Sequence, residues 1–257
     1  QEALPARVIN VEYLPTVGLQ LYGSCTSWAI VYYYKTWQEA REHGWKRPNT
    51  GINPERVMSP AFIYNLANGG NPHAGSAVIA NFEYLRDYGA CSCAEMEPNA
   101  DPRVWPTEDQ YLAAFPQRAK SFAYIETQST DGFNALKAHL ASGDLACFSM
   151  NIYDNFHAYP ATAGASNEVF YANVGDLYFA PGATSAGHEM CIIGYDDNKA
   201  WTDGQGVNHT GAVLVVNSWG TEWGAYLPEA GSRGFLWLSY DYFQAVANDT
   251  AIMEDRI

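Results

Sequence analysis

Asn217-Ser218-Trp219-Gly220-Thr221-Glu222-Trp223-Gly224 is the stretch of sequence that gives two earlier segments their meaning. The first of these is Gly23-Ser24-Cys25-Thr26-Ser27-Trp28-Ala29, and the second is Gly187-His188-Glu189-Met190-Cys191. In this order the three segments supply a sulfur nucleophile, an imidazole base and a side-chain amide that can orient the imidazole. Any one of them alone would be a weak signal. Together they predict a nucleophilic active site with Cys25, His188 and Asn217 as its catalytic triad.

Cys25 is predicted to lie at or near the start of an amphipathic helix. Apolar residues recur at helical spacing from Ala29 to Ala40, and the helix is expected to run toward Gly44. The positive end of a helix dipole stabilises a thiolate, and it lowers a thiol pKa from about 8.5, in paired catalytic cases to about 3 to 4. Taken alone, Cys25 would be a packed structural thiol, but this position and the two partner segments favour a reactive one.

The two halves of the chain have different patterns. Further helices are expected around residues 59–66, 76–88 and 133–141, so that the first half is mainly helical. The second half is mainly β, with two long loops between its strands. The strands are expected at Leu145–Asn151, His188–Tyr195, Val213–Asn217 and Gly234–Ser239, and the loops at Tyr153–Pro181 and Asp196–Gly211.

Composition excludes several classes of protein. The 257 residues include 47% hydrophobic and 16% charged residues, which is typical of a packed globular chain. The net charge of −14 and the pI near 4.7 argue against a nucleic-acid partner or an anionic membrane surface. No apolar run reaches the roughly 18 residues of a membrane span, and the first residues lack the pattern of a signal peptide. Because the sequence does not begin with Met, we expect that a targeting segment, a pro-segment or both were removed, although a cloning choice gives the same sequence.

The cysteine count is compatible with a free nucleophile. Five is an odd number, so at least one thiol stays free if the others pair, and Cys25 is the natural candidate. Cys91 and Cys93 are two positions apart and are poorly placed to bridge one another. Cys147 and Cys191 lie in apolar strand-like runs, where a reduced cysteine packs as a small hydrophobe.

We expect no metal site and no other cofactor. A group of acidic and amide side chains lacks the regular ligand series of a calcium loop, and a hairpin turn explains it more simply. The histidines other than His188 show no metal-ligand spacing. The group consists of Asp196, Asp197, Asn198 and Asp203.

From about residue 11 onward the chain resembles the papain-like cysteine peptidases, and most closely the bacterial-type branch, in which a small or branched residue follows the nucleophile. The segment from Asn217 to Gly224 is the most specific part of the match. The resemblance implies a single peptidase domain over 1–257 with an α+β fold of two subdomains. The helical left subdomain would take in about 20–122, the β-barrel-like antiparallel right subdomain about 1–19 and 123–257, and the active-site cleft would lie between them. Weaker likenesses occur at Ser59-Pro60, Gly69-Gly70 and Leu136-Lys137.

The resemblance also implies a role for each matching residue. Cys25 would attack a peptide carbonyl as thiolate, while His188 would hold the proton and Asn217 would orient His188. Trp219 would shield the hydrogen bond between His188 and Asn217 from water. Gln20 would donate to the oxyanion together with the backbone N–H of Cys25. The substrate-binding residues would be Gly69 and Gly70, which allow close approach of substrate backbone, and Asn71 and Pro72, which begin one wall of a pocket.

This chain departs from the family pattern at several positions. Gln20 precedes Cys25 by five positions, whereas the glutamine of the family stands one position further upstream, where Leu19 lies here. Tyr22 replaces a cysteine that forms a disulfide in many relatives, and Thr26 replaces the customary Trp, so the framework disulfides are expected to be absent. His188 and Asn217 lie further beyond Cys25 than the family's roughly 130 to 150 positions, which insertions in the two long loops would explain.

The predicted function is therefore that of a cysteine endopeptidase acting through a thioester acyl-enzyme. Its partners would be a peptide or protein substrate and a removed inhibitory pro-segment, and we expect an exported monomer. Two alternatives stay open. The first is a catalytically inert binding module with the same fold, and the second is an acyl-transferring relative that passes the acyl group to an amine. Product analysis with an added amine would separate hydrolase from transferase.

Overall fold

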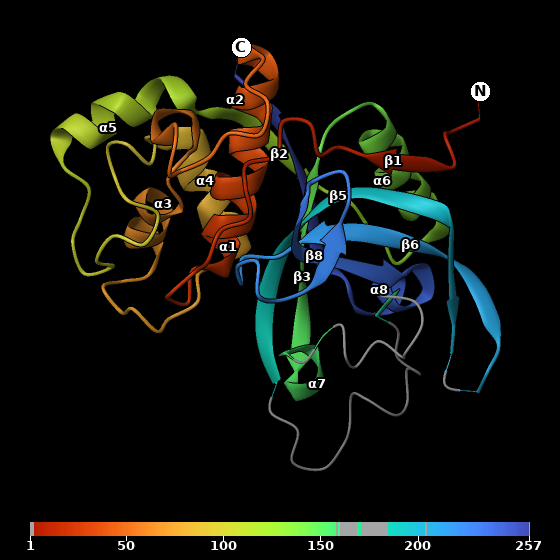
Figure 1. Ribbon diagram of the computed structural model, residues 1–257. Coiled ribbons are helices and arrows are strands. Elements are labelled where there is room, and N and C mark those ends of the chain that lie inside the picture. The colour runs from red at the N-terminus through yellow and green to blue at the C-terminus, as the bar shows by residue number, and fades with distance from the viewer. Residues whose placement is uncertain (1–2, 158, 160–168, 171–184, 204, 257) are drawn as a thin grey trace. The chain divides into compact units, whose positions relative to one another are not determined.

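The computed structural model describes residues 3–157, 159, 169–170, 185–203 and 205–256 (Figure 1). The chain divides into two compact units. Unit 1 comprises residues 1–10 and 125–250, and unit 2 comprises residues 11–124 and 251–257. Strand β9 (Asn248–Asp255) therefore begins in unit 1 and ends in unit 2.

Unit 2 is mainly helical. Its only long pairing of strands among the described residues joins β2 to β9, antiparallel, with Tyr124 opposite Ala251. Its elements are α1 (Cys25–Ser27), the π-helix η1 (Trp28–Lys35), α2 (Thr36–His43), the 3-10 helix η2 (Pro54–Arg56), α3 (Pro60–Ala67), α4 (Val78–Asp87), α5 (Glu108–Ala114), the 3-10 helix η3 (Phe115–Gln117), β2 (Ala119–Tyr124) and the end of β9.

The helices α1, η1 and α2 form one continuous helical run through the core of unit 2. All residues from Thr26 to Ala40 are buried, the polar ones included, so this segment is enclosed on every side and is not the amphipathic helix that the sequence predicts. The run ends at Gly44, toward which the sequence predicts it, and Gly44 has the left-handed conformation with φ of 69°. The wider π-helical turns were not predicted, because the spacing of apolar residues does not distinguish them from an α-helix where every position is buried.

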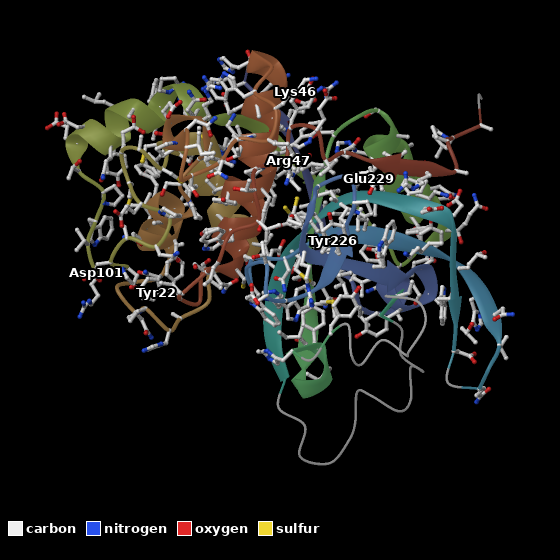
Figure 2. All side chains as sticks on the ribbon, in the orientation of Figure 1. Tyr22, Lys46, Arg47, Asp101, Tyr226 and Glu229 are labelled. Carbon is white, nitrogen blue, oxygen red and sulfur yellow. The ribbon has the colours of Figure 1, made fainter. Side chains whose placement is uncertain are left out.

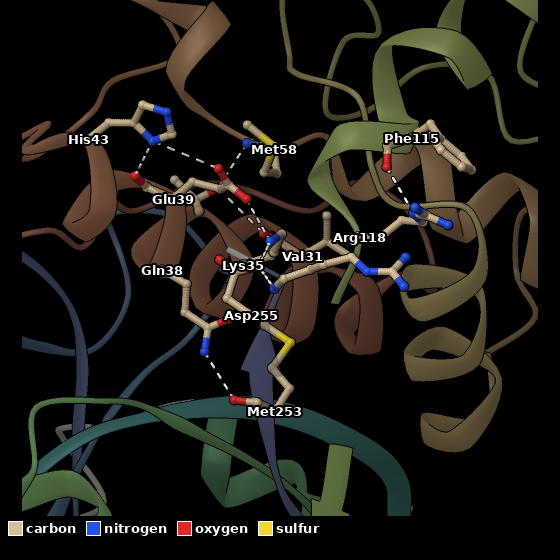
Figure 3. A network of polar contacts seen from close by, with 12 residues as sticks. Val31, Lys35, Gln38, Glu39, His43, Met58, Phe115, Arg118, Met253 and Asp255 are labelled. Carbon is tan, nitrogen blue, oxygen red and sulfur yellow. Dashed lines mark hydrogen bonds and ion pairs between the residues drawn. The ribbon is translucent and has the colours of Figure 1, made fainter. Parts of the chain in front are cut away.

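The C-terminal strand is fastened to this central run by polar contacts (Figure 3). Lys35 is fully buried, and its Nζ atom lies 2.6 Å from Oε1 of Glu39 and also contacts the carboxylate of Asp255. Gln38 donates from Nε2 to the carbonyl of Met253 at 3.1 Å. The end of β9 is thus an integral part of unit 2.

Unit 1 is built on an antiparallel sheet. Strand β5 pairs with β3 on one side and with β6 on the other, and β6 pairs with β8. At the edges, β1 pairs with β5, β7 pairs with β8, and β4 runs parallel to β8. The elements are β1 (Arg7–Ile9), α6 (Thr130–Ala141), β3 (Ala146–Tyr153), α7 (Asp154–His157), β4 (Val169–Phe170), β5 (Ser185–Thr202), β6 (Asn208–Val216), β7 (Ala225–Leu227), β8 (Ser232–Ser239), α8 (Tyr240–Val246) and the start of β9.

Aromatic side chains from two helices and a strand join in the core of unit 1. Phe243 of α8 lies 5.1 Å from Phe148 of β3 and 6.0 Å from Phe133 of α6, measured between ring centroids. Gly194 lets β1 lie close to β5, because a Cβ atom there would stand 2.1 Å from the carbonyl oxygen of Val8. No described helix of either unit is long and apolar enough to cross a membrane.

The structure corrects one of the two predicted loops. Residues 196–211 were expected to be irregular, but β5 continues to Thr202 and β6 begins at Asn208, so that most of this stretch is a β-hairpin. The rings of Trp201 and His209 stack across it with centroids 4.3 Å apart, and Asp203 accepts hydrogen bonds from backbone N–H groups in the turn. The polar composition hid these strands. The other predicted loop, Tyr153–Pro181, lies largely outside the described residues.

Candidate active site

His188 and Asn217 lie next to one another in unit 1. His188 is part of β5, and Asn217 directly follows the paired strand β6, in which Val216 stands opposite Cys191. This register brings the ends of the two strands together. The Nε2 atom of His188 lies 2.8 Å from Oδ1 of Asn217, and both residues are buried.

The hydrogen bonds around Asn217 define the tautomer of His188. The backbone N–H of Ser218 donates to Oδ1 of Asn217 at 2.8 Å, which identifies this atom as the oxygen of the amide. Because Oδ1 only accepts, Nε2 of His188 must carry the proton in their hydrogen bond. The Nδ1 atom of the neutral ring therefore keeps its lone pair, and this is the arrangement that a general base needs.

Aromatic rings surround the imidazole of His188. The ring of Trp219 lies 4.9 Å from it and that of Phe156 lies 6.2 Å from it, measured between centroids. Trp223 packs against Trp219 at 5.3 Å, and His157 stacks on Trp219 at 4.7 Å. Rings of this kind keep water away from a buried hydrogen bond. Trp219 was predicted from the sequence, whereas Phe156 and His157 carried no local signal.

Burial strongly affects the charge of His188. It lowers the pKa of the imidazole from 6.5 to about 4, although the hydrogen bond with Asn217 opposes this shift. Transfer of a charged group out of water disfavours its ionised form, and this explains the direction. At neutral pH the ring is uncharged unless an anion faces it.

Cys25 lies in unit 2, at the first residue of the central helical run. It is half-buried, whereas the other four cysteines are buried, and none of the five forms a disulfide. Burial raises the pKa of Cys91 to about 12 and also raises the pKa of Cys93 and Cys147. Cys25 is therefore the thiol best placed to meet a reagent or a substrate.

Gln20 belongs to the same unit as Cys25. Its side chain is half-buried and donates from Nε2 to the carbonyl of Tyr22 at 2.9 Å. Since a carbonyl oxygen only accepts, this contact defines which end of the Gln20 amide is the nitrogen. The predicted site residues thus form two groups, with Cys25 and Gln20 in unit 2 and His188, Asn217 and Trp219 in unit 1.

The predicted substrate-binding residues Gly69, Gly70, Asn71 and Pro72 form an exposed turn after α3. Both glycines have positive φ, 61° and 80°, which other residues rarely adopt. The carbonyl of Pro72 accepts a hydrogen bond from the N–H of Gly23 at 3.3 Å, so the turn contacts the nucleophile segment.

The hydroxyl of Tyr64 in α3 bonds backbone groups of this turn. Its buried hydroxyl lies 2.8 Å from the carbonyl oxygen of Ala74 and 3.1 Å from that of Pro72. Burial raises the pKa of the Tyr64 hydroxyl, and the nearby Cys25 contributes to the shift. Sequence analysis missed Tyr64, because an aromatic residue in an apolar helix is usually a core residue.

One group of side chains in the described part of the chain has the composition of a metal site. It consists of Glu39, Glu42 and His43, all on α2. The Glu39 carboxylate contacts the ammonium of Lys35, and Nδ1 of His43 lies 2.9 Å from the carbonyl oxygen of Glu39. Because these contacts already engage two of the three side chains, we assign no metal to the group.

No protein family model and no curated protein matches the sequence. Solved structures do match it over nearly its whole length. Xylellain, a cysteine protease from Xylella fastidiosa, has 19% identity and a TM-score of 0.70, and the match covers 99% of this chain and 88% of that one. The chain has the papain-like cysteine peptidase fold. This confirms the predicted α+β class with two subdomains.

Two further papain-like structures show the same similarity. Bromelain from Ananas comosus, in complex with the E64 inhibitor, has 16% identity and a TM-score of 0.63, covering 98% of this chain and 99% of that one. Digestive procathepsin L 3 from the larval midgut of Tenebrio molitor has 16% identity and a TM-score of 0.62, covering 99% of this chain and 71% of that one. The match to the bacterial xylellain agrees with the predicted branch.

Proposed function

We propose that the protein is a cysteine peptidase that hydrolyses peptide bonds through a thioester acyl-enzyme. The observation that carries the proposal is the buried hydrogen bond of 2.8 Å between Nε2 of His188 and Oδ1 of Asn217. It leaves Nδ1 of the ring as a base, on a fold whose solved examples include cysteine proteases. The half-buried Cys25 at a helix start is the matching nucleophile.

In the proposed reaction a proton passes from Sγ of Cys25 to Nδ1 of His188. The thiolate then attacks the carbonyl carbon of the substrate, a C–S bond forms, and the carbonyl electrons move to the oxygen. The backbone N–H of Cys25 and an Nε2–H of Gln20 donate to this oxyanion.

The imidazolium of His188 next gives its proton to the leaving amine as the C–N bond breaks. A water molecule hydrolyses the thioester with His188 as base, and Cys25 regains its proton. Asn217 keeps the ring oriented throughout, and Trp219 excludes water from the hydrogen bond between them.

We propose endopeptidase action on peptides or proteins. The exposed turn from Gly69 to Pro72 would meet the substrate backbone, because its contact with Gly23 links it to the nucleophile segment. Solved relatives include a procathepsin L and the Amb a 11 protease in its proform. By analogy with these proforms, we propose that an inhibitory pro-segment is removed from this chain. We also propose that the enzyme is exported and monomeric.

The decisive experiment combines labelling with turnover. The protein is treated with an E64-type epoxide, the adduct is located by mass spectrometry, and cleavage of a quenched peptide blocked at both ends is measured. We expect the adduct on Cys25 and loss of cleavage. Cys25→Ala and His188→Ala should retain less than about a thousandth of the activity, and Asn217→Ala should lose less, about a hundredfold.

His209→Ala provides a matched control. This histidine also contacts a polar side chain, Asp203, but it lies opposite Trp201 at the turn end of the β5–β6 hairpin, whereas His188 lies near the other end of β5, so cleavage should not change. If Cys25→Ala cleaved peptides as fast as the parent, the mechanism would be wrong. Slow labelling of all five cysteines without any cleavage would replace the peptidase with an inert binding module.

A further inference from the structure

The backbone on both sides of Gln20 is held by a single side chain. The N–H of Leu21 donates to Oδ1 of Asn99 at 3.0 Å, and Nδ2 of Asn99 donates to the carbonyl of Leu19 at 2.9 Å. Because one contact is to a donor and the other to an acceptor, the orientation of the Asn99 amide is fixed without ambiguity. We call these two hydrogen bonds the Asn99 clamp.

The clamp imitates a strand partner. In an extended chain the carbonyl of one residue and the N–H of the residue two positions later point to the same side. A carboxamide carries one acceptor and donor groups at a matching separation, so it can bond both, as a neighbouring strand would. The residue in between, Gln20, is then held at both of its peptide groups.

Asn99 is itself attached to a rigid element. Two buried amides at the end of α3 hold the residues that follow Asn99. Asn65 donates to the carbonyls of Asp101 and Val104 at 2.9 and 2.8 Å. Asn68 donates to the carbonyl of Pro102 at 2.9 Å. Figure 2 shows Tyr22 and Asp101 close together, at the place where the two segments meet.

The rest of the segment before Cys25 is anchored further upstream. Tyr32 donates to the carbonyl of Thr16 at 2.9 Å, and the N–H of Gly18 donates to the hydroxyl of Tyr33 at 3.1 Å. None of the five cysteines forms a disulfide, so no covalent bridge fixes the residues between Gly18 and Cys25. The Asn99 clamp is placed where that support is needed.

We propose that Asn99 is a positioning residue for the oxyanion hole. It holds the backbone of Gln20 so that the Nε2 atom, oriented by the carbonyl of Tyr22, reaches the oxygen of the tetrahedral intermediate. The inference rests on the proposed peptidase function, and it assigns no contact between Asn99 and substrate.

The test compares Asn99→Ala, Gln20→Ala and the double variant with the parent. Three properties are measured, namely kcat and KM on a quenched peptide, the affinity for a peptide aldehyde, and the rate of Cys25 alkylation by iodoacetamide. The aldehyde forms a tetrahedral adduct that uses the oxyanion hole, whereas alkylation does not. For Asn99→Ala we expect kcat to fall about tenfold or more and the aldehyde to bind correspondingly more weakly. KM and the alkylation rate should stay within about twofold of the parent.

The double variant separates positioning from general damage to the fold. If Asn99 acts through Gln20, adding Asn99→Ala to Gln20→Ala should cause no further loss of kcat. Gln110→Ala is the matched control, because this amide also bonds two backbone groups, the N–H of Thr107 and the carbonyl of Glu95, at 2.9 and 2.8 Å. These two bonds of Gln110 are to Thr107 and Glu95 and not to the segment around Gln20, so Gln110→Ala should keep the parental kcat.

Two different failures can be told apart. A parent that cleaves peptides while Asn99→Ala keeps its full kcat, or shows a loss that adds to that of Gln20→Ala, would overturn the role of Asn99 alone. A parent that neither cleaves peptides nor binds the aldehyde would overturn the proposed function, and the role of Asn99 with it. If Asn99→Ala lowers kcat and the alkylation rate by the same factor and also lowers the melting temperature, Asn99 is merely structural.

Discussion

The protonation of a single residue, His188, depends on the charge that faces it. Burial lowers the pKa of its imidazole to about 4 against the opposing effect of the hydrogen bond with Asn217, so the ring would be neutral at pH 7. A thiolate on Cys25 would favour the imidazolium and raise this pKa. We therefore predict that His188 titrates near pH 4 in Cys25→Ala and at a clearly higher pH in the parent. NMR titration of the ring in both proteins measures the difference, and equal pKa values would argue against an ion pair.

The same titration must appear in stability. In Cys25→Ala the folded pKa of His188, about 4, lies below the ordinary value of 6.5, so the unfolded chain binds more protons between these values. The pH-dependent contribution of His188 to the free energy of unfolding is therefore fully present above pH 6.5 and is lost as the pH falls toward 4. This contribution amounts to about 3 kcal/mol. Urea unfolding of Cys25→Ala at pH 4 and pH 7, compared with Cys25→Ala/His188→Gln, isolates this contribution.

Among the elements, the central helical run of unit 2 depends on the ammonium of Lys35, which faces the carboxylates of Glu39 and Asp255. Burial raises the pKa of Glu39, and Lys35 opposes that shift. Lys35→Met would remove the ammonium that both the buried carboxylate of Glu39 and the half-buried carboxylate of Asp255 contact, and we predict a loss of about 3 to 5 kcal/mol at pH 7. Urea unfolding measures this loss.

The pH dependence of Lys35→Met follows from the direction of the Glu39 shift. A carboxyl group whose folded pKa is raised destabilises the protein as the pH rises above its ordinary value of 4.5, and removing Lys35 enlarges the effect. The deficit should therefore shrink toward pH 4.5. Lys46→Met is the control, because Lys46 pairs with Glu12 on an exposed surface and should show no comparable change. A deficit independent of pH would mean that lost packing, and not charge, is the cause.

Over the whole chain, the elements that could be predicted are those with continuous apolar runs. The helix that begins at Cys25 and the strands that carry His188 and Val216 contain such runs, and the structure confirms these elements and buries the runs. The continuation of β5 to Thr202 and the strand β9 lack such an apolar run, because polar residues occupy much of both. There, pairing with a neighbouring strand decides the conformation, and local sequence does not encode the neighbour.

The site shows the same division between local and distant information. His188 and Asn217 could be predicted as partners because each lies in a short characteristic segment, and the structure places them in hydrogen-bond contact. Tyr64 and Asn99 could not, because their roles come from contacts with backbone groups in other segments, 78 positions away in the case of Asn99 and Leu21. An asparagine in a turn carries no sign of the distant backbone segment that it supports.

The five thiols probe the unfolding of the whole molecule. Cys25 is half-buried, whereas Cys91 and Cys93 are buried in unit 2 and Cys147 and Cys191 in unit 1. We predict one fast thiol per native chain with a disulfide reagent, lost in Cys25→Ala, and five thiols in urea without reductant. Since a buried thiol reacts only after its surroundings open, the two buried cysteines of each unit should share one rate.

Mass spectrometry of each cysteine over time then separates two cases. A single rate for all four means that the units unfold together, and two rates mean that they unfold separately. A second fast thiol would contradict the buried positions, and fewer than five in urea would reveal a disulfide.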